Sequence, residues 1–161
     1  MYLDNHGKHA LFYRRAMADE DKNLSWEEAR ELLGEVIARH EGFYKDDSRA
    51  QRNNNPGNLT KGNGCSEFDG GGFCRYGTSE EGWDALHHQL NMMENGTSHV
   101  YNLAMTPTQF VARYASSSPA AEQAAYAAAI AAALGIKPDQ KMEEKVDHWV
   151  TIDGKHVLLS Y

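Results

Sequence analysis

The sequence predicts an α+β fold that is mainly helical and forms a single domain of 161 residues. Three segments carry a capping box followed by apolar residues at spacings of three and four, which is the pattern of amphipathic helices. A stretch rich in Gly and Asn interrupts these segments, and apolar residues on either side of Asp153-Gly154 indicate a β-hairpin near the end of the chain. We therefore expect helices around one core, accompanied by short hairpins.

The composition excludes several classes of protein. Hydrophobic residues make up 41% and charged residues 24%, a balance that supports a core and excludes a disordered tail. Lys and Arg number 16 against 23 Asp and Glu, a net charge of −7, and no basic stripe is present, so we expect no nucleic-acid partner. The longest nearly uncharged apolar stretch, 124–136, is much shorter than the roughly 20 residues that span a membrane.

The first helix is predicted to begin after Ser25, which forms a capping box with Glu28, and to continue to about His40. Gly42 should end it, because glycine adopts the left-handed conformation without steric cost. Residues 1–24 are predicted to be an N-terminal appendage. Turn-forming residues dominate the segment 46–76, which we predict to be non-helical.

That segment ends in a predicted small hairpin around Asp69-Gly70, where Cys65 and Cys74 can approach each other. The sequence leaves open whether the two cysteines form a disulfide.

Four further helices and a second hairpin complete the prediction. Capping boxes at 78–81 and 106–109 should begin two of the helices, and the first of these carries an apolar face of Trp83, Leu86, Leu90 and Met93. An alanine-rich helix starts near Ser118-Pro119 and ends at Gly135. A last helix is predicted from Pro138 through Val146, followed by the hairpin at 150–159.

Glu41 is unusual among the acidic residues of the first helix. It lies four residues after Ile37 and eight after Leu33, so its carboxylate extends the apolar stripe, whereas Glu31 and Glu35 are expected on the solvated face. Partial burial and the negative end of the helix dipole should both raise the pKa of Glu41, as a general acid requires.

The alternative for Glu41 is a structural role. It would then be a solvated glutamate at the helix end, paired with Arg39 or Lys45.

The sequence resembles the family of lysozyme-like lytic transglycosylases and phage endolysins over residues 25–136. The resemblance is carried by His40-Glu-Gly-Phe43 and by Arg52-Asn-Asn-Asn-Pro-Gly-Asn-Leu59, which correspond to the E-G-F and R-N-N-N-P-G-N-L motifs of that family. Less specific likenesses follow at 73–76, 78–83, 108–111, 113–115 and 125–126.

The resemblance implies a lysozyme-like fold, with a β-hairpin lobe and a helical lobe, in a catalytic domain at 25–137. It also implies cleavage of the β-1,4 bond between N-acetylmuramic acid and N-acetylglucosamine in peptidoglycan, with Glu41 as the catalytic acid. Residues 138–161 would be an extension packed on the same domain.

A second carboxylate would distinguish a lysozyme from a transglycosylase, because hydrolysis requires a base or nucleophile near the acid. Asp46, Asp47 and Asp69 are candidates, but each is better explained as a turn residue or solvated charge. The sequence therefore favours a lytic transglycosylase, in which the muramyl 6-hydroxyl attacks internally. A true lysozyme remains the alternative.

Six residues are predicted to bind substrate or to shape the site. The loop supplies Arg52, Asn54, Asn55 and Asn58, whose polar groups suit sugar hydroxyl and N-acetyl groups. The sequence does not distinguish contact with sugar from positioning of Glu41. Tyr76 and Tyr126 can stack on sugar rings, with a place in the core as the alternative.

The histidines do not predict a metal site. His6 with His9 and the adjacent His87-His88 lack the spacing of zinc ligands, so we expect no metal and no cofactor. One competing hypothesis, a metal-dependent peptidase or amidase that acts on the peptide stems, is supported by these histidines alone. The other competing hypothesis is a glycan-binding or phage structural module without turnover, which the acidic net charge favours.

The expected partner is a peptidoglycan strand, and we expect a monomer. The substrate lies in the periplasm or cell wall, yet residues 1–22 show no apolar run typical of a secretory signal. A phage-released enzyme, a virion-associated enzyme or one whose leader has been removed would each fit.

Overall fold

The computed structural model describes residues 23–60 and 64–159. The described chain is mainly helical with small sheets, which confirms the predicted α+β class. It divides into two compact units, one formed by residues up to Leu33 together with Met92 onwards, and the other by Gly34–Asn91. Helices α2 (Trp26–His40) and α4 (Ser79–Glu94) each continue from one unit into the other.

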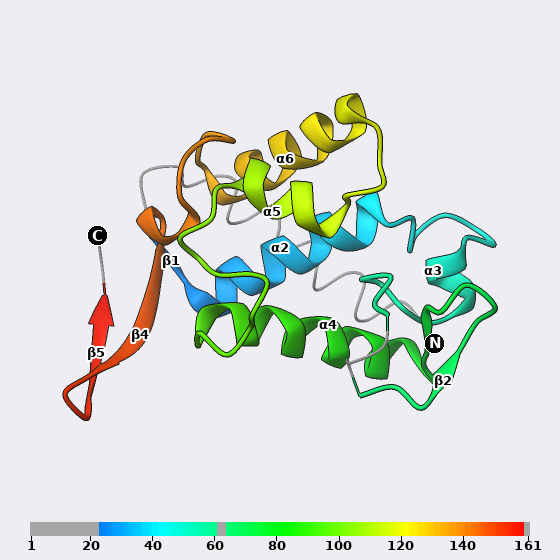
Figure 1. The fold of residues 1–161 in the computed structure, drawn as a ribbon, viewed down its shortest axis with the longest axis horizontal. Helices are drawn as coiled ribbons and strands as arrows, with labels where there is room; N and C mark the ends of the chain where they lie inside the picture. The colour runs from blue at the N-terminus through cyan, green and yellow to red at the C-terminus, as the bar shows by residue number, and fades with distance from the viewer. Residues whose placement is uncertain (1–22, 61–63, 160–161) are drawn as a thin grey trace. The chain divides into compact units, whose positions relative to one another are not determined.

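The first unit combines a small sheet with two packed helices. The sheet has the order β1-β4-β5, in which β1 (Leu24–Ser25) runs parallel to β4 (Val146–Ile152), and β4 forms an antiparallel hairpin with β5 (Lys155–Leu159). Helices α5 (Pro107–Tyr114) and α6 (Ala120–Leu134) pack against each other (Figure 1).

Local sequence explains the bounds of these helices. Ser25 and Glu28 exchange the two hydrogen bonds of the predicted capping box at the start of α2. Thr106 and Gln109 do the same for α5, whose Phe110 is buried. Gly135 ends α6 in the left-handed conformation, with φ of 71°, as predicted.

The N-terminal boundary differs from the prediction of an appendage at 1–24. Leu24 is buried, its N–H donates to the carbonyl of Lys145, and it pairs with Val146 in the sheet. The Asn23 amide also donates to the Asp147 carboxylate at 3.1 Å. Residues 23 and 24 therefore belong to the fold, and the rest of the predicted appendage lies outside the described residues.

The predicted last helix at 138–146 is wrong. Only a single 3₁₀ turn, η1 (Met142–Glu144), forms there, and the hairpin of β4 and β5 follows it as predicted. The N–H groups of Met142 and Glu143 donate to the carbonyls of Met105 and Leu103, and so they are not available for an α-helical ladder.

The second unit contains the Asn-rich loop, a short hairpin and most of α4. The hairpin joins β2 (Glu67–Phe68) to β3 (Cys74–Arg75) in antiparallel register, close to its predicted position. The prediction that 46–76 contains no helix is wrong at α3 (Arg49–Arg52), a single turn in which the N–H of Gln51 donates to the Ser48 hydroxyl.

Helix α4 packs its predicted apolar face inward, since Trp83, Leu86 and Leu90 are buried. The Thr78 hydroxyl accepts from the N–H of Glu81 as expected, but the Glu81 carboxylate accepts from Gly77 rather than closing the capping box. Gly82 faces the Asn-rich loop so closely that a Cβ there would overlap the carbonyl oxygen of Asn54.

Candidate active site

Glu41 lies one residue beyond the end of α2. Its N–H still donates to Ile37 at 2.8 Å, and Gly42 then reverses the chain with φ of 82°. The next residue, Phe43, is buried and packs edge-on against Trp83 with ring centroids 5.8 Å apart. The turn therefore presents a partly exposed Glu41 between a helix and a buried aromatic side chain.

The Asn58 amide contacts Glu41 twice. Its Nδ2 donates to the carboxylate oxygen Oε2 at 3.1 Å and to the main-chain carbonyl at 3.3 Å. Asn58 has a φ of 47°, in the left-handed region where Asn is among the few residues found without large strain. The structure therefore brings together the predicted acid and one predicted loop residue, and gives the latter a positioning contact.

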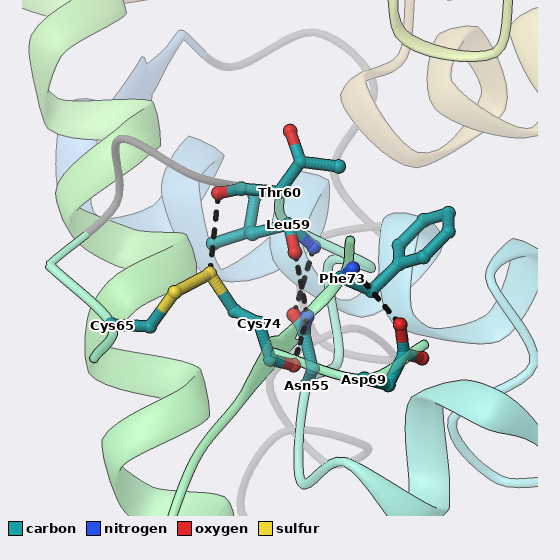
Figure 2. The surroundings of a disulfide bond; sticks show 7 residues. All are labelled: Asn55, Leu59, Thr60, Cys65, Asp69, Phe73 and Cys74. Carbon is teal, nitrogen blue, oxygen red and sulfur yellow. Dashed lines mark hydrogen bonds between the residues drawn. A yellow bond between two sulfur atoms is a disulfide. The ribbon is translucent and has the colours of Figure 1, made fainter. Parts of the chain in front are cut away.

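Asn55 holds the loop in place from within. It is fully buried, and its Nδ2 donates to the carbonyls of Leu59 at 2.9 Å and Cys74 at 3.0 Å. Its Oδ1 accepts from the N–H of Leu59 at 2.9 Å (Figure 2). Because every polar group of this side chain is occupied inside the protein, Asn55 positions the loop against β3 and is not placed to bind sugar.

A disulfide joins Cys65 and Cys74 in the structure (Figure 2). Cys74 is fully buried in β3, and its Sγ lies 3.2 Å from the carbonyl oxygen of Thr60. A disulfide sulfur carries no hydrogen, so the thiol can donate to Thr60 only after reduction. The same cysteine also supplies the carbonyl that Asn55 binds, and the disulfide thus ties the hairpin to the buried end of the loop.

Asp69 organises the hairpin. One of its carboxylate oxygens accepts from the N–H groups of Gly71 and Phe73, and the other contacts the Asn53 amide at 2.8 Å and the Arg49 guanidinium at 3.3 Å. The hydrogen bond from Asn53, with further help from the backbone donors and from Arg49, holds the pKa of Asp69 below its ordinary value.

These contacts make Asp69 a structural carboxylate. Both of its oxygens are engaged by protein donors, which leaves it poorly suited to act as the second catalytic carboxylate. The other two candidates, Asp46 and Asp47, are exposed in the turn that precedes α3.

Asn54, Tyr76 and Arg52, the other predicted binding residues of this unit, are at least partly exposed. Asn54 also has a left-handed φ, of 50°, and its amide donates to the carbonyl of Tyr76 at 3.0 Å. Tyr76 is partly exposed, and burial of part of its ring raises its pKa. Arg52 is exposed and points its guanidinium at the Asp47 carboxylate, 3.6 Å away.

Tyr126 belongs to the other unit, in α6, and only 4% of its surface is exposed. A ring so deeply buried has no face available for stacking on a sugar. The structure therefore corrects Tyr126 from a binding residue to a core residue, the alternative that its helical spacing had left open.

The structure buries Glu35. It was expected on the solvated face of α2, but only 1% of its surface is exposed. Its two carboxylate oxygens accept from the Arg39 Nε at 2.9 Å and from the Tyr44 hydroxyl at 2.7 Å. Burial and the adjacent Glu35 raise the pKa of Tyr44 well above its ordinary value.

The cluster of Glu35, Arg39 and Tyr44 holds the turn after Glu41 against α2, because Tyr44 follows the turn and Glu35 precedes it. It also pairs the Arg39 guanidinium with the Glu35 carboxylate at 2.9 Å. An Arg four residues after a Glu on a helix is a signal for such a pair, but the contribution of Tyr44 depends on the turn at Gly42.

The chain matches no protein-family model, no curated protein and no solved structure. Within residues 23–60 and 64–159, no helix is long and apolar enough to cross a membrane. The same residues contain no group of three or more His, Cys, Asp or Glu side chains arranged to hold a metal ion.

Proposed function

We propose that this protein cleaves the β-1,4 bond between N-acetylmuramic acid and N-acetylglucosamine in peptidoglycan, as a lytic transglycosylase with Glu41 as its general acid and base. The observation that carries the proposal is the contact between Asn58 and the Glu41 carboxylate at 3.1 Å. This contact brings together the two motifs that carry the family resemblance, the helix-end glutamate and the Asn-rich loop.

The proposed reaction has two steps that use one carboxyl group. Protonated Glu41 donates its proton to the departing glycosidic oxygen, and the bond from that oxygen to the muramyl C1 breaks as positive charge develops on the sugar. The muramyl 6-hydroxyl then attacks C1, while the Glu41 carboxylate removes the hydroxyl proton. The products are a 1,6-anhydromuramyl end and a free N-acetylglucosamine end, and Glu41 is again protonated.

The state of the other carboxylates supports the transglycosylase over the lysozyme. A hydrolase of the usual kind needs a second carboxylate roughly 5–9.5 Å from the acid, available to a nucleophilic water or to the sugar. Asp69 is fully engaged by the hairpin, and Asp46 and Asp47 are exposed turn residues. Internal attack by the 6-hydroxyl needs none of them.

The proposed place of action is the periplasm or cell wall, where this substrate lies. The disulfide between Cys65 and Cys74 suits such oxidising surroundings. The enzyme would reach its substrate after phage-mediated release, on a virion or after removal of a leader.

The test compares the muropeptides that the wild-type protein and Glu41→Gln release from purified peptidoglycan, identified by mass spectrometry. Glutamine keeps the shape of the side chain but cannot donate the proton, so we expect a folded variant that still binds glycan and loses at least about 10³-fold in activity. Anhydromuramyl ends that disappear in the variant support the proposal.

Other products point to the alternatives. Reducing muramyl ends from the wild-type protein identify a lysozyme. Release that EDTA abolishes identifies a metal-dependent peptidase or amidase. A folded wild-type protein that binds glycan and releases no product identifies a binding or structural module.

A further inference from the structure

The hydrogen bond from the Asn58 amide to the Glu41 main-chain carbonyl determines which way the amide is turned. Its Nδ2 bonds to the Glu41 main-chain carbonyl at 3.3 Å as well as to Oε2 at 3.1 Å. A main-chain carbonyl is an acceptor at every pH. If the amide were reversed, its oxygen would face this carbonyl in either protonation state of Glu41, and two acceptors would oppose each other.

The Asn58 amide therefore keeps its nitrogen toward Glu41 whether the carboxyl group is charged or neutral. It does so although its own oxygen, Oδ1, is buried and receives no hydrogen bond from the described residues. An N–H donor aimed at Oε2 interacts more strongly with the charged carboxylate than with the neutral acid, because the charged oxygen is the stronger acceptor.

We propose that Asn58 is a positioning residue that keeps an N–H donor on Oε2 of Glu41 in both protonation states and stabilises the carboxylate once the proton has left. This inference rests on the proposed function, in which Glu41 first donates a proton and then accepts one. A donor held at Oε2 fixes the orientation of the carboxyl group for donation and stabilises the charge that donation leaves behind.

The surrounding structure holds Asn58 rigidly enough for this role. Its N–H donates to the carbonyl of Asn55 at 3.1 Å, and Asn55 is itself fixed by three hydrogen bonds of its buried side chain. Gly82 of α4 packs against the same loop, with the Pro56 Cδ 2.9 Å from the place a Cβ would take. The left-handed φ of Asn58 then directs its amide at Glu41.

The test is a carbon-13 NMR titration of the Glu41 carboxyl group, identified as the signal missing from Glu41→Gln. In Asn58→Gly, which tolerates the left-handed backbone, we expect a pKa for Glu41 higher by about one pH unit, because the donor to the charged form is gone. We also expect kcat to fall about tenfold, with the pH profile displaced upward by the same amount.

Asn54→Gly is the matched control. Asn54 lies in the same loop with nearly the same φ, but its amide donates to the carbonyl of Tyr76. The Glu41 titration should therefore be unchanged in this variant. The titratable groups nearest in the chain, His40, Lys45 and Asp46, are the same in every protein compared.

Asn58→Asp gives an independent measurement should Asn58→Gly not fold. Asp also tolerates a left-handed φ, and it replaces the donor by a carboxylate, so the pKa of Glu41 should rise further than in Asn58→Gly. An unchanged Glu41 titration in the folded Asn58 variants would overturn the inference. An equal displacement in Asn54→Gly would also overturn it, because loosening of the loop would then be the cause.

The titration is independent of turnover. A Glu41 signal that responds to Asn58, in a protein that releases no muropeptides, would refute the proposed function and leave the contact established. Anhydromuramyl products from a wild-type enzyme whose pH profile and titration are the same in Asn58→Gly would refute the role of Asn58 alone.

Discussion

The Asn-rich loop at 53–59 and the helix pair α5–α6 are held together by different physics. In the loop, the amides of Asn53, Asn54, Asn55 and Asn58 each donate to a specific oxygen elsewhere in the second unit. In the helix pair, alanines and a few larger residues pack against each other, and most of the buried side chains, Phe110, Ile130 and Leu134 among them, bring no polar group.

Because the two regions are stabilised differently, they should tolerate different substitutions. Apolar packing is non-directional, so a core position accepts another side chain of similar volume at a cost below about 1.5 kcal/mol. A buried amide has donors and an acceptor in fixed directions, and its replacement leaves several partners unsatisfied at once. The loop should therefore be sensitive to the identity of each residue, and the helix pair mainly to volume.

The largest expected effect is at Gly82. Gly82→Ala places a Cβ onto the carbonyl oxygen of Asn54 and within 2.9 Å of the Pro56 Cδ, both of which belong to the rigid loop. We expect a loss of roughly 4 kcal/mol or more in the free energy of unfolding, or failure to fold, measured by urea denaturation.

Gly34→Ala is the matched control in α2. Its Cβ would meet only side-chain atoms of Trp83 and His87, at 3.4 Å or more. The higher helix propensity of alanine should leave this variant as stable as the wild type or up to about 1 kcal/mol more stable. Equal stability of the two alanine variants would contradict the close approach between α4 and the loop.

The next effect compares the two regions directly. Asn55→Leu removes the amide that serves three buried backbone groups, and we expect a loss of about 3 kcal/mol. Ile130→Val removes one methylene from the buried face of α6 and should cost about 1 kcal/mol. Urea denaturation measures both values, and a smaller loss for Asn55→Leu than for Ile130→Val would reverse the comparison.

The smallest effect is the pH dependence contributed by Asp69. Because the folded protein lowers the pKa of this carboxyl group, the stabilisation is present above the ordinary Asp pKa of about 3.9 and is lost as the pH falls through the lower folded value. Asp69→Asn should be less stable than the wild type at pH 7, with the difference shrinking below about pH 4.

Asp84→Asn is the control for this comparison, since it removes an exposed carboxylate of α4 and reports the general effect of one lost charge. A stability difference between Asp69→Asn and the wild type that stays constant from pH 7 to pH 3 would show that the charge of Asp69 does not stabilise the hairpin.

Local patterns predicted most of the helical structure. The capping boxes at Ser25 and Thr106 begin helices where expected, and Gly42 and Gly135 adopt the predicted left-handed conformation. The apolar face of α4 is buried as its spacing indicated. These features depend on residues within four or five positions of each other, and so they can be predicted from the sequence alone.

The candidate site was predictable only in part. The position of Glu41 on the apolar stripe singled it out, and the family resemblance added the Asn-rich loop. The raised pKa of Glu41 stays a prediction that the titration measures.

The roles of the individual asparagines could not be predicted without the tertiary structure. Four asparagines within six residues look alike in sequence, yet Asn55 serves the buried loop, Asn53 and Asn54 serve the hairpin and the segment after it, and Asn58 serves Glu41. What separates them is the partner that folding brings to each amide.

Local patterns in the sequence were enough to predict the α+β class, most helix starts and stops and the small hairpins, because periodicity and capping involve residues close together in the chain. The same patterns singled out Glu41, whose catalytic role stays a prediction. Four other features depend on tertiary contacts: the burial of Glu35, the 3₁₀ turn at 142–144, the core position of Tyr126 and the contact between Asn58 and Glu41. Each of these depends on a hydrogen bond or packing contact outside the local pattern, and the burial or engagement that follows cannot be derived from spacing along the chain.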